Sequence, residues 1–95
     1  MDEDVLDRLK RLKPHLLKST KIERLRLFGS YATGQATKQS DVDILLTFKE
    51  TPDLFELGGI HTVLSEGLGK KVDIAVEDYL LPEFRDRILN EARDV

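Results

Sequence analysis

Three aspartates and a glycine–serine pair are the residues of this chain whose types and spacing could do chemistry. Gly29-Ser30 is followed, after ten residues, by Asp41 and Asp43, and Asp73 lies further along the chain. Two carboxylates at positions i and i+2 of a strand project from the same face, roughly 6–7 Å apart. Like charges at this distance are unfavourable unless a positive group lies between them. Such oxygen ligands suit Mg²⁺, which takes one or two carboxylates and completes its shell with water and phosphates.

Asp73 adds a third carboxylate in the middle of an apolar run, residues 71–76. If its strand neighbours the strand of Asp43, the carboxylates converge, and such a cluster can hold two metal ions about 3.5–4 Å apart. A charge among apolar neighbours needs a partner, and the sequence offers no local Arg to either residue. Asp41 could instead be a solvated acid at the start of a strand. We therefore expect Asp43 and Asp73 to be the firmer pair.

The glycine–serine pair could hold a phosphate. Glycine after a strand lets a phosphate approach the backbone closely, and Ser30 adds a hydroxyl donor. If Ser30 begins a short helix, its amides point at the same anion. Gly34 would allow the loop to turn back into the next strand. The spacing predicts a triphosphate seat after one strand and metal ligands on the next.

The elements that must position these residues follow from the periodicity of apolar residues. Strands are predicted over 22–28, 41–48 and 71–76, and a helix over 4–18 that Pro14 should kink or divide. Thr51-Pro52-Asp53 predicts the start of a second helix, running to about Leu68 with close packing or a bend at Gly58-Gly59. Its apolar stripe is Leu54, Leu57, Leu64 and Leu68. A last helix should run from about Glu77 or Pro82 to Ala92, with Leu81, Phe84, Ile88 and Ala92 on its apolar side.

Strands that alternate with helices predict a sheet covered by helices. A short link between the first two strands suits an antiparallel pair, and the long helical crossover to the third suits a parallel one. The predicted fold class is α/β (α+β), a small mixed β-sheet flanked by helices. The 95 residues predict a single domain over residues 1–95.

Composition excludes several classes of function. The chain has no Cys, which excludes disulfides, thiolate zinc sites and cysteine nucleophiles. No apolar run approaches the ~18 residues of a membrane span, and the acidic start, residues 1–4, is wrong for a secretory signal, so we expect a cytoplasmic protein. The net charge is −3, although eight of the 15 Lys and Arg residues lie between Arg8 and Arg26. A solvated helix face explains that cluster.

Other candidate residues carry weaker signals. His15 and His61 have no Cys or second His at metal-ligand spacing, so we expect structural roles. Some aromatic and basic side chains could stack on a base or touch a phosphate, but packing or solvation explains them as well or better: Tyr31, Tyr79, Arg85 and Arg87.

At these residues the chain resembles the minimal nucleotidyltransferases of the DNA polymerase β superfamily. The matching segments are residues 27–32, Gly34, and residues 40–45, 55–57, 71–73 and 87–92. The resemblance implies the palm-like nucleotidyltransferase fold and a triphosphate bound by Gly29 and Ser30. It also implies two Mg²⁺ ions bound by Asp41 and Asp43, with Asp73 completing the catalytic metal site and helping to deprotonate the attacking hydroxyl.

The resemblance also implies a partner. Many members of that family act as antitoxins beside a helical HEPN ribonuclease toxin, and some transfer AMP to a tyrosine of the toxin. The implied activity is therefore Mg²⁺-dependent transfer of AMP from ATP to a hydroxyl of a HEPN toxin. Family members commonly carry Arg where this chain has Thr33, which leaves rate and nucleotide affinity open. Lys38 could substitute for that charge, although a solvated loop Lys is the simpler interpretation.

Two alternatives of different classes stay open. One is a non-catalytic antitoxin that neutralises the toxin by binding alone; the intact carboxylates argue against it, and Thr33 argues mildly for it. The other is a transferase for a small molecule with its acceptor pocket at a dimer interface. The chain is too short to add a second substrate-binding domain, so the acceptor or a second subunit must complete the site, as a homo- or hetero-oligomer. Neither a membrane nor nucleic acid as a direct substrate is expected.

Overall fold

The computed structural model describes residues 4–95, and Met1–Glu3 lie outside the described residues. The three strands predicted from alternation are confirmed to within one residue at each end. A fourth strand of two residues is too short to show any periodicity. Within the described residues, no helix combines the length and the apolar character needed to cross a membrane. The elements in chain order are α1 (Val5–Ser19), β1 (Ile22–Phe28), α2 (Ser30–Thr33), β2 (Val42–Phe48), α3 (Leu54–Leu68), β3 (Val72–Val76), the 3₁₀ helix η1 (Glu77–Tyr79), α4 (Pro82–Glu91) and β4 (Arg93–Asp94).

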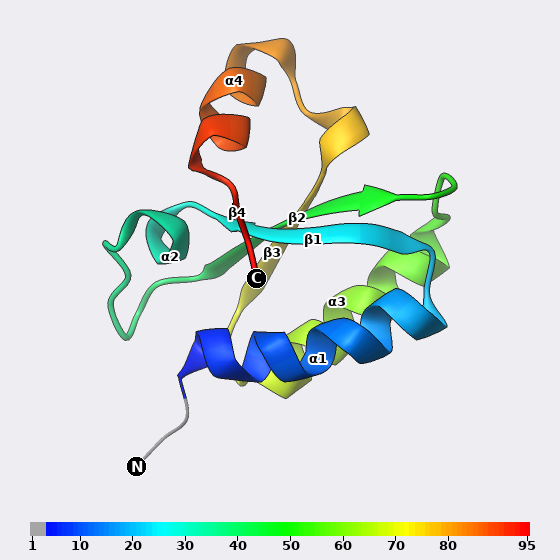
Figure 1. Cartoon of the computed structure of the whole chain (residues 1–95), viewed down its shortest axis with the longest axis horizontal. Coiled ribbons are helices and arrows are strands. Elements are labelled where there is room, and N and C mark those ends of the chain that lie inside the picture. Colours follow the sequence, from blue (N-terminus) through cyan, green and yellow to red (C-terminus); the bar gives the residue numbers. More distant parts are fainter. Residues whose placement is uncertain (1–3) are drawn as a thin grey trace.

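The strands form one mixed sheet in the order β3-β2-β1-β4 (Figure 1). β1 pairs antiparallel with β2 and with β4, and β2 pairs parallel with β3. The predicted α/β sheet, its mixed pairing and the adjacency of the second and third strands are thus confirmed. The α3 crossover makes the parallel pair possible, because parallel neighbours cannot be joined by a tight turn.

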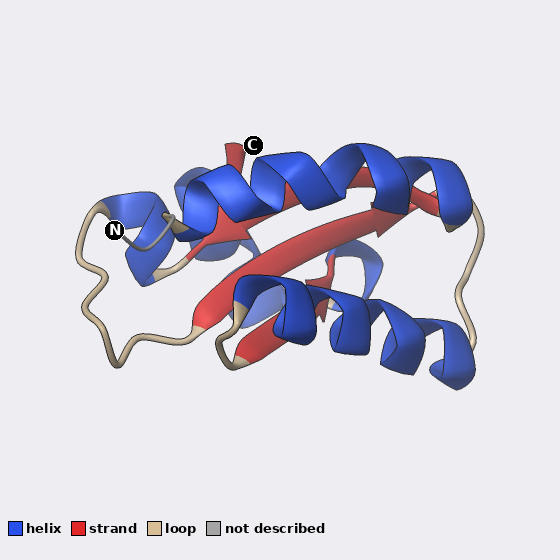
Figure 2. Cartoon of the chain, turned by 90° about the horizontal axis from the view of Figure 1, so that it is seen from below, coloured by secondary structure: helices blue, strands red, loops and turns tan. Residues whose placement is uncertain are grey.

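Helices α1 and α3 lie together over one face of the sheet (Figure 2). Alternate residues of each strand point into this layer, as the period of two requires. A Cβ added to Gly67 would lie 2.5 Å from Leu12 Cδ1, so the two helices are closely packed at this point. The apolar side chains with almost no exposed surface include Leu9, Leu16, Leu25, Val42, Ile44, Leu46, Leu64 and Leu68.

Of three predictions about the helices, the structure excludes one of the two predicted outcomes for Pro14 and for Gly58-Gly59, and the predicted cap of α3 is wrong. α1 is not divided by Pro14, whose exposed position leaves the carbonyl of the preceding turn open to water. No close packing occurs at Gly58 or Gly59, where an added Cβ would meet nothing within 4 Å. α3 is capped by Asp53 rather than Thr51, because the Asp53 side chain accepts from the Glu56 amide and Glu56 completes a capping box.

The predicted apolar stripes are too long. Leu54 is 84% exposed, so the buried side of α3 begins at Ile60. In α4 only Ile88 is buried, while Leu81 and Phe84 are 56% and 44% exposed. Periodicity alone cannot tell which turns of a helix pack against the rest of the chain, and these positions do not.

Candidate active site

The three predicted aspartates lie together where β2 and β3 begin. Asp41 directly precedes β2, and Asp43 is the register partner of Asp73 on β3. Paired residues on neighbouring strands are about 4.8 Å apart. Val42, which lies between Asp41 and Asp43, is fully buried against α1 and α3. The aspartates therefore project from the opposite face of the sheet, all on the same side.

The three carboxylates differ in environment. Asp43 is half-buried; burial, and then the charges of Asp73, Asp41 and Glu91, raise its pKa above the ordinary value. Asp41 is also half-buried, with its Oδ2 3.7 Å from Nζ of Lys71. Asp73 is exposed, so the expectation that apolar neighbours enclose it is wrong. The reason is topological: β3 is an edge strand, and Asp73 projects from the face that α1 and α3 leave open.

The Gly29-Ser30 loop touches this acidic group. Phe28, the last residue of β1, pairs with Asp43, and Gly29 follows with φ +69° and ψ −150°. A Cβ on Gly29 would overlap Oδ2 of Asp43 and lie 3.1 Å from its Cγ. Both the positive φ and the contact require glycine here. Ser30 begins the short helix α2, as predicted, and Gly34 ends it with φ +79° before the chain returns to β2.

The donor chemistry of the site fits Mg²⁺. In residues 4–95, no group of three or more His, Cys, Asp or Glu side chains is arranged as a ready metal cage. Mg²⁺ does not require one, since it uses one or two carboxylates and takes its remaining ligands from water and phosphates. The charges that raise the pKa of Asp43 are all acidic, so a cation between the carboxylates would relieve their repulsion. The assignment of Asp41, Asp43 and Asp73 as metal ligands stays a prediction.

Two residues at this site were missed from the sequence, Glu91 and Arg93. Glu91 Oε2 accepts a hydrogen bond from the Gly29 amide at 3.2 Å, and Arg93 Nε donates to the Ala32 carbonyl at 2.7 Å. Both contacts span more than sixty residues of chain. The only available signal was that Glu91 lies inside the last segment resembling the minimal nucleotidyltransferases.

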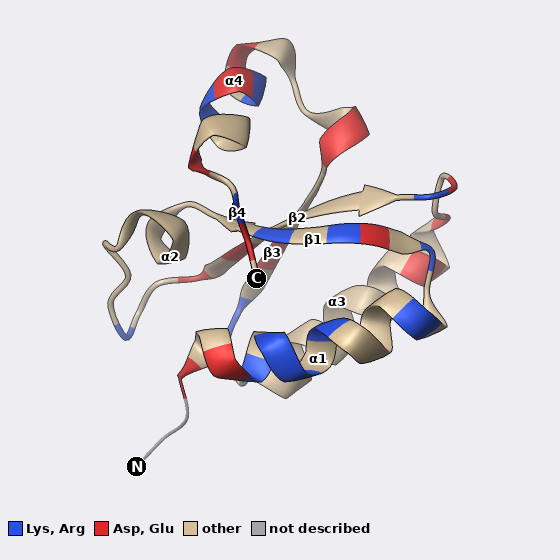
Figure 3. Cartoon of the chain, in the orientation of Figure 1, with Lys and Arg blue, Asp and Glu red and all other residues tan. Residues whose placement is uncertain are grey.

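A buried ion pair on the same face was also missed. Arg26 of β1 is only 6% exposed; its guanidinium donates to Glu77 of η1 and, at 3.3 Å, to the Thr47 hydroxyl. The pair ties η1, which follows directly after β3, to the centre of the sheet. Figure 3 shows basic residues spread along α1, where Lys10 and Lys18 are exposed as the solvated-face interpretation predicts, whereas Arg26 of the same cluster is buried.

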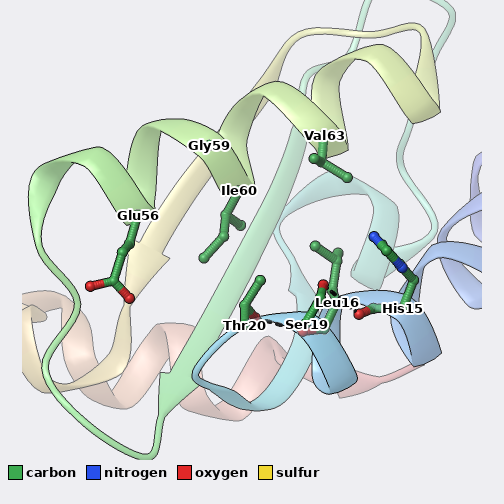
Figure 4. Close-up of a pocket in the computed structure, with 8 residues that line it drawn as sticks. All are labelled: His15, Leu16, Ser19, Thr20, Glu56, Gly59, Ile60 and Val63. Atoms are coloured by element: carbon green, nitrogen blue, oxygen red, sulfur yellow. Dashed lines mark hydrogen bonds between the residues drawn. The ribbon is translucent and has the colours of Figure 1, made fainter.

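Neither histidine touches the group of three aspartates, although His61 lines the same hollow along β3 as Asp73. His61 Nε2 is 2.8 Å from the Val72 carbonyl oxygen, at the outer edge of β3. His15 lies at a groove of about 320 Å³ between α1 and α3, together with Glu56 and Ile60 (Figure 4). This groove is on the helix-covered side, away from the carboxylates, and we give it no part in the chemistry. A second hollow, of about 370 Å³, runs along β3 and includes Asp73 among its lining residues.

The remaining candidates have local structural roles. Tyr31 packs against the core, whereas Tyr79 is 58% exposed and does not. The Thr33 hydroxyl donates to the Gly29 carbonyl at 3.2 Å. Arg85 and Arg87 lie on the exposed side of α4, where Arg87 stacks over Phe84. The exposed Lys38 accepts, through its main-chain carbonyl, a hydrogen bond from Lys70.

A mixed sheet that carries two carboxylates on one strand and a third on its parallel neighbour, beside a glycine–serine loop, defines a nucleotidyl-transfer fold. Comparison with known families agrees: the model of the nucleotidyltransferase domain matches residues 3–95. The chain belongs to this family and is a nucleotidyltransferase enzyme of the minimal type.

Relatives with known names agree with this assignment. A candidate protein adenylyltransferase of Methanocaldococcus jannaschii is 42% identical over 86 residues, covering 90% of this chain and 91% of the relative. The protein adenylyltransferase MntA of Thermococcus cleftensis is 34% identical over 70 residues, covering 74% and 71%.

Solved structures show the same fold. A candidate minimal nucleotidyltransferase superposes with a TM-score of 0.74 at 33% identity, covering 96% of this chain and 88% of the other. The MNT antitoxin complex with the tri-AMPylated HEPN toxin of Shewanella oneidensis superposes with a TM-score of 0.67. At 20% identity, covering 94% of this chain and 68% of the other, that match shows the fold alone.

Proposed function

We propose that this nucleotidyltransferase transfers AMP from ATP to a tyrosine hydroxyl of a helical HEPN-type toxin and acts as its antitoxin. The observation that carries the proposal is the contact between the Gly29-Ser30 loop and Asp43, with Asp41 and Asp73 on the same face. This contact supports a phosphate-binding loop beside carboxylates that would hold metal ions. The names of the relatives in M. jannaschii and T. cleftensis support a protein as acceptor.

Each residue of the site has a place in the proposed reaction. Gly29 and Ser30 bind the triphosphate, which directs its α-phosphorus toward the face of the aspartates. Two Mg²⁺ ions held by Asp41, Asp43 and Asp73 would neutralise charge on the attacking oxygen and on the leaving pyrophosphate. The tyrosine oxygen forms a bond to the α-phosphorus as the bond to the β-phosphate oxygen breaks. Pyrophosphate leaves with the bonding electron pair, and the tyrosine proton goes to Asp73.

The exposure of Asp73 suits a macromolecular acceptor. Because β3 is an edge strand, an acceptor can reach Asp73 from outside the sheet, along the hollow that borders β3. The described residues supply no second domain that would cover this approach. We infer that the partner protein completes the active site with its own surface, in a hetero-oligomer.

The position of a radioactive label in ATP distinguishes this reaction from its alternatives. The chain is incubated with Mg²⁺ and the purified partner toxin, using ATP labelled either at the α- or at the γ-phosphate, and each other nucleoside triphosphate in turn. The proposal expects α-label on a partner tyrosine, no γ-label on protein, and a preference for ATP. Asp41→Asn should reduce labelling at least ~100-fold, as expected for loss of a metal ligand. Asp86→Asn, the same charge change on the exposed side of α4, should have no effect.

Each contrary result has a distinct meaning. Toxin inhibition that persists without label, and is unchanged by Asp41→Asn, would replace the proposal with an antitoxin that acts by binding alone. Label on a small hydroxyl compound but not on the toxin would replace it with a small-molecule transferase.

A further inference from the structure

The end of the chain returns to β1, the strand that leads into the Gly29-Ser30 loop. α4 ends at Glu91, and β4 then pairs antiparallel with the last residues of β1, with Arg93 opposite Leu27. Figure 1 shows this segment crossing beside β1, between α4 and the core helices. Glu91 and Arg93 are therefore delivered to the point where β1 passes into the Gly29-Ser30 loop.

These two side chains contact opposite ends of the loop. The Glu91 carboxylate accepts from the Gly29 amide at 3.2 Å, just before α2, and Arg93 Nε donates to the carbonyl of Ala32, in α2, at 2.7 Å. Both hydrogen bonds are charge-assisted, which makes them stronger than bonds between neutral groups. The signs also suit a helical turn, with the acid at its amide end and the base at its carbonyl end.

The loop needs such outside support. Gly29 has a φ of +69°, a conformation that glycine adopts readily but does not prefer over others, so its own backbone does not hold the loop in one state. The hydrogen bonds of the Gly29 carbonyl are local, because it accepts from the amides of Ala32 and Thr33, which both belong to α2. Ala32 and Tyr31 anchor α2 to the core, whereas at Gly29 itself the contacts with distant parts of the chain come from Asp43 on one side and Glu91 on the other.

We propose that Glu91 and Arg93 are positioning residues that clamp the Gly29-Ser30 loop in the conformation that receives the triphosphate. This inference rests on the proposed nucleotide-binding role of the loop. The competing explanation is that the C-terminal segment only stabilises the sheet. That segment has anchors that do not touch the loop, because Asp94 pairs bidentately with Arg24 at 2.6 and 2.9 Å and the Val95 carbonyl accepts from Lys13 at 2.8 Å. These anchors provide matched controls.

The test compares variants of the full chain by amide hydrogen exchange of residues 29–34 without nucleotide, and by calorimetric titration with Mg²⁺–ATP. Glu91→Ala should speed exchange of the Gly29 amide and weaken ATP binding, each about tenfold, as for one lost charge-assisted hydrogen bond. Glu91→Gln keeps an acceptor oxygen without the charge and should restore both values in part, because a neutral acceptor forms a weaker hydrogen bond. Arg93→Ala should act in the same direction as Glu91→Ala. Asp94→Ala should lower the melting temperature without changing loop exchange or ATP affinity.

The outcomes separate this clamp from the proposed function. The clamp is overturned if Glu91→Ala changes loop exchange and ATP affinity no more than Asp94→Ala does, or if Glu91→Gln fails to rescue them. If the unmodified chain has a protected loop that Glu91→Ala releases, yet binds no nucleoside triphosphate, the proposed nucleotide role is overturned while the physical clamp stands.

Discussion

The two faces of the sheet are covered differently, although the same strands build both. On the face beneath α1 and α3, the side chains of β2 are apolar and fully buried, as Val42, Ile44 and Leu46 show. On the opposite face the same strand carries Asp43, and the neighbouring strands carry Asp73 and Arg26. One strand thus contributes to the core and to the candidate site at alternate positions, because its side chains alternate with a period of two.

The comparison separates stability from chemistry. Burial of apolar surface under α1 and α3 stabilises the fold. The carboxylate of Asp43 destabilises the fold. Burial and the charges of Asp73, Asp41 and Glu91 raise the pKa of Asp43 and so disfavour its charged form. A group that is unfavourable in the folded chain and has no structural partner of opposite charge is typical of a functional site. Substitutions on the two faces should therefore have opposite consequences.

Asp43→Asn should produce the largest effect and test the open face. We expect transfer activity to fall at least ~100-fold, since a metal ligand is lost. The metal-free chain should become more stable at neutral pH, with a melting temperature higher by about 2–5 °C, because a strained charge is removed from a functional site. Activity is measured by label transfer and stability by thermal unfolding in the presence of a chelator. A less stable Asp43→Asn chain would contradict the comparison.

The pH dependence of stability gives a second measure of the same group. The pKa of Asp43 is raised by folding, so the folded chain binds its proton at a higher pH than the unfolded chain does. Its unfavourable contribution is present above the raised pKa and disappears as the pH falls through that pKa to the unfolded value. Lowering the pH from neutral should therefore narrow the stability difference between Asp43→Asn and the unmodified chain. A difference that stays constant across this range would show that Asp43 has an ordinary pKa.

Leu64→Ala tests the covered face and should have the next largest effect. Leu64 is fully buried, so the truncation should cost about 2–4 kcal/mol of unfolding free energy through lost burial and the cavity left behind. Transfer activity per folded molecule should not change, because the cavity is on the other side of the sheet from the aspartates. The neighbouring Val63, which is 37% exposed, gives the control Val63→Ala, with an expected cost below ~1 kcal/mol. Denaturant unfolding measures both. Equal costs for the two variants would contradict the burial assigned to α3.

Local patterns in the sequence predicted the sheet well. Partial alternation of apolar and polar residues in β1 and β2 predicts each strand, and the lengths of the connections predict which neighbours are parallel. Gly29 was predicted to let a phosphate approach the backbone closely, and the structure adds that a Cβ there would overlap Asp43. These features depend on residues close in sequence or on the period of a single element, which a sequence displays directly.

What could not be predicted depends on distant contacts. Glu91 reaches Gly29 only because β4, two residues long, pairs with β1, and no periodicity marks so short a strand. A charged residue in an alternating strand is expected to be exposed, but Arg26 is covered by η1 and pairs with Glu77. Asp73 was expected to be enclosed by its apolar neighbours, but it is exposed because β3 lies at the sheet edge. In each case the burial of a residue is decided by an element elsewhere in the chain.

Gly59→Ala should have the smallest effect, and it tests the outer side of the helix layer. An added Cβ meets nothing within 4 Å, so the higher helix propensity of Ala should stabilise the chain by about 0.5–1 kcal/mol. Gly67→Ala is the matched control in the same helix, where the Cβ would lie 2.5 Å from Leu12 Cδ1, and there the gain should vanish or change sign. Denaturant unfolding again measures both, beside label transfer to the partner. If Gly59→Ala stabilises the chain and leaves label transfer unchanged, the chemistry is confined to the open face of the sheet. If Gly59→Ala stabilises the chain but reduces label transfer, the outer side of α3 also contacts the partner.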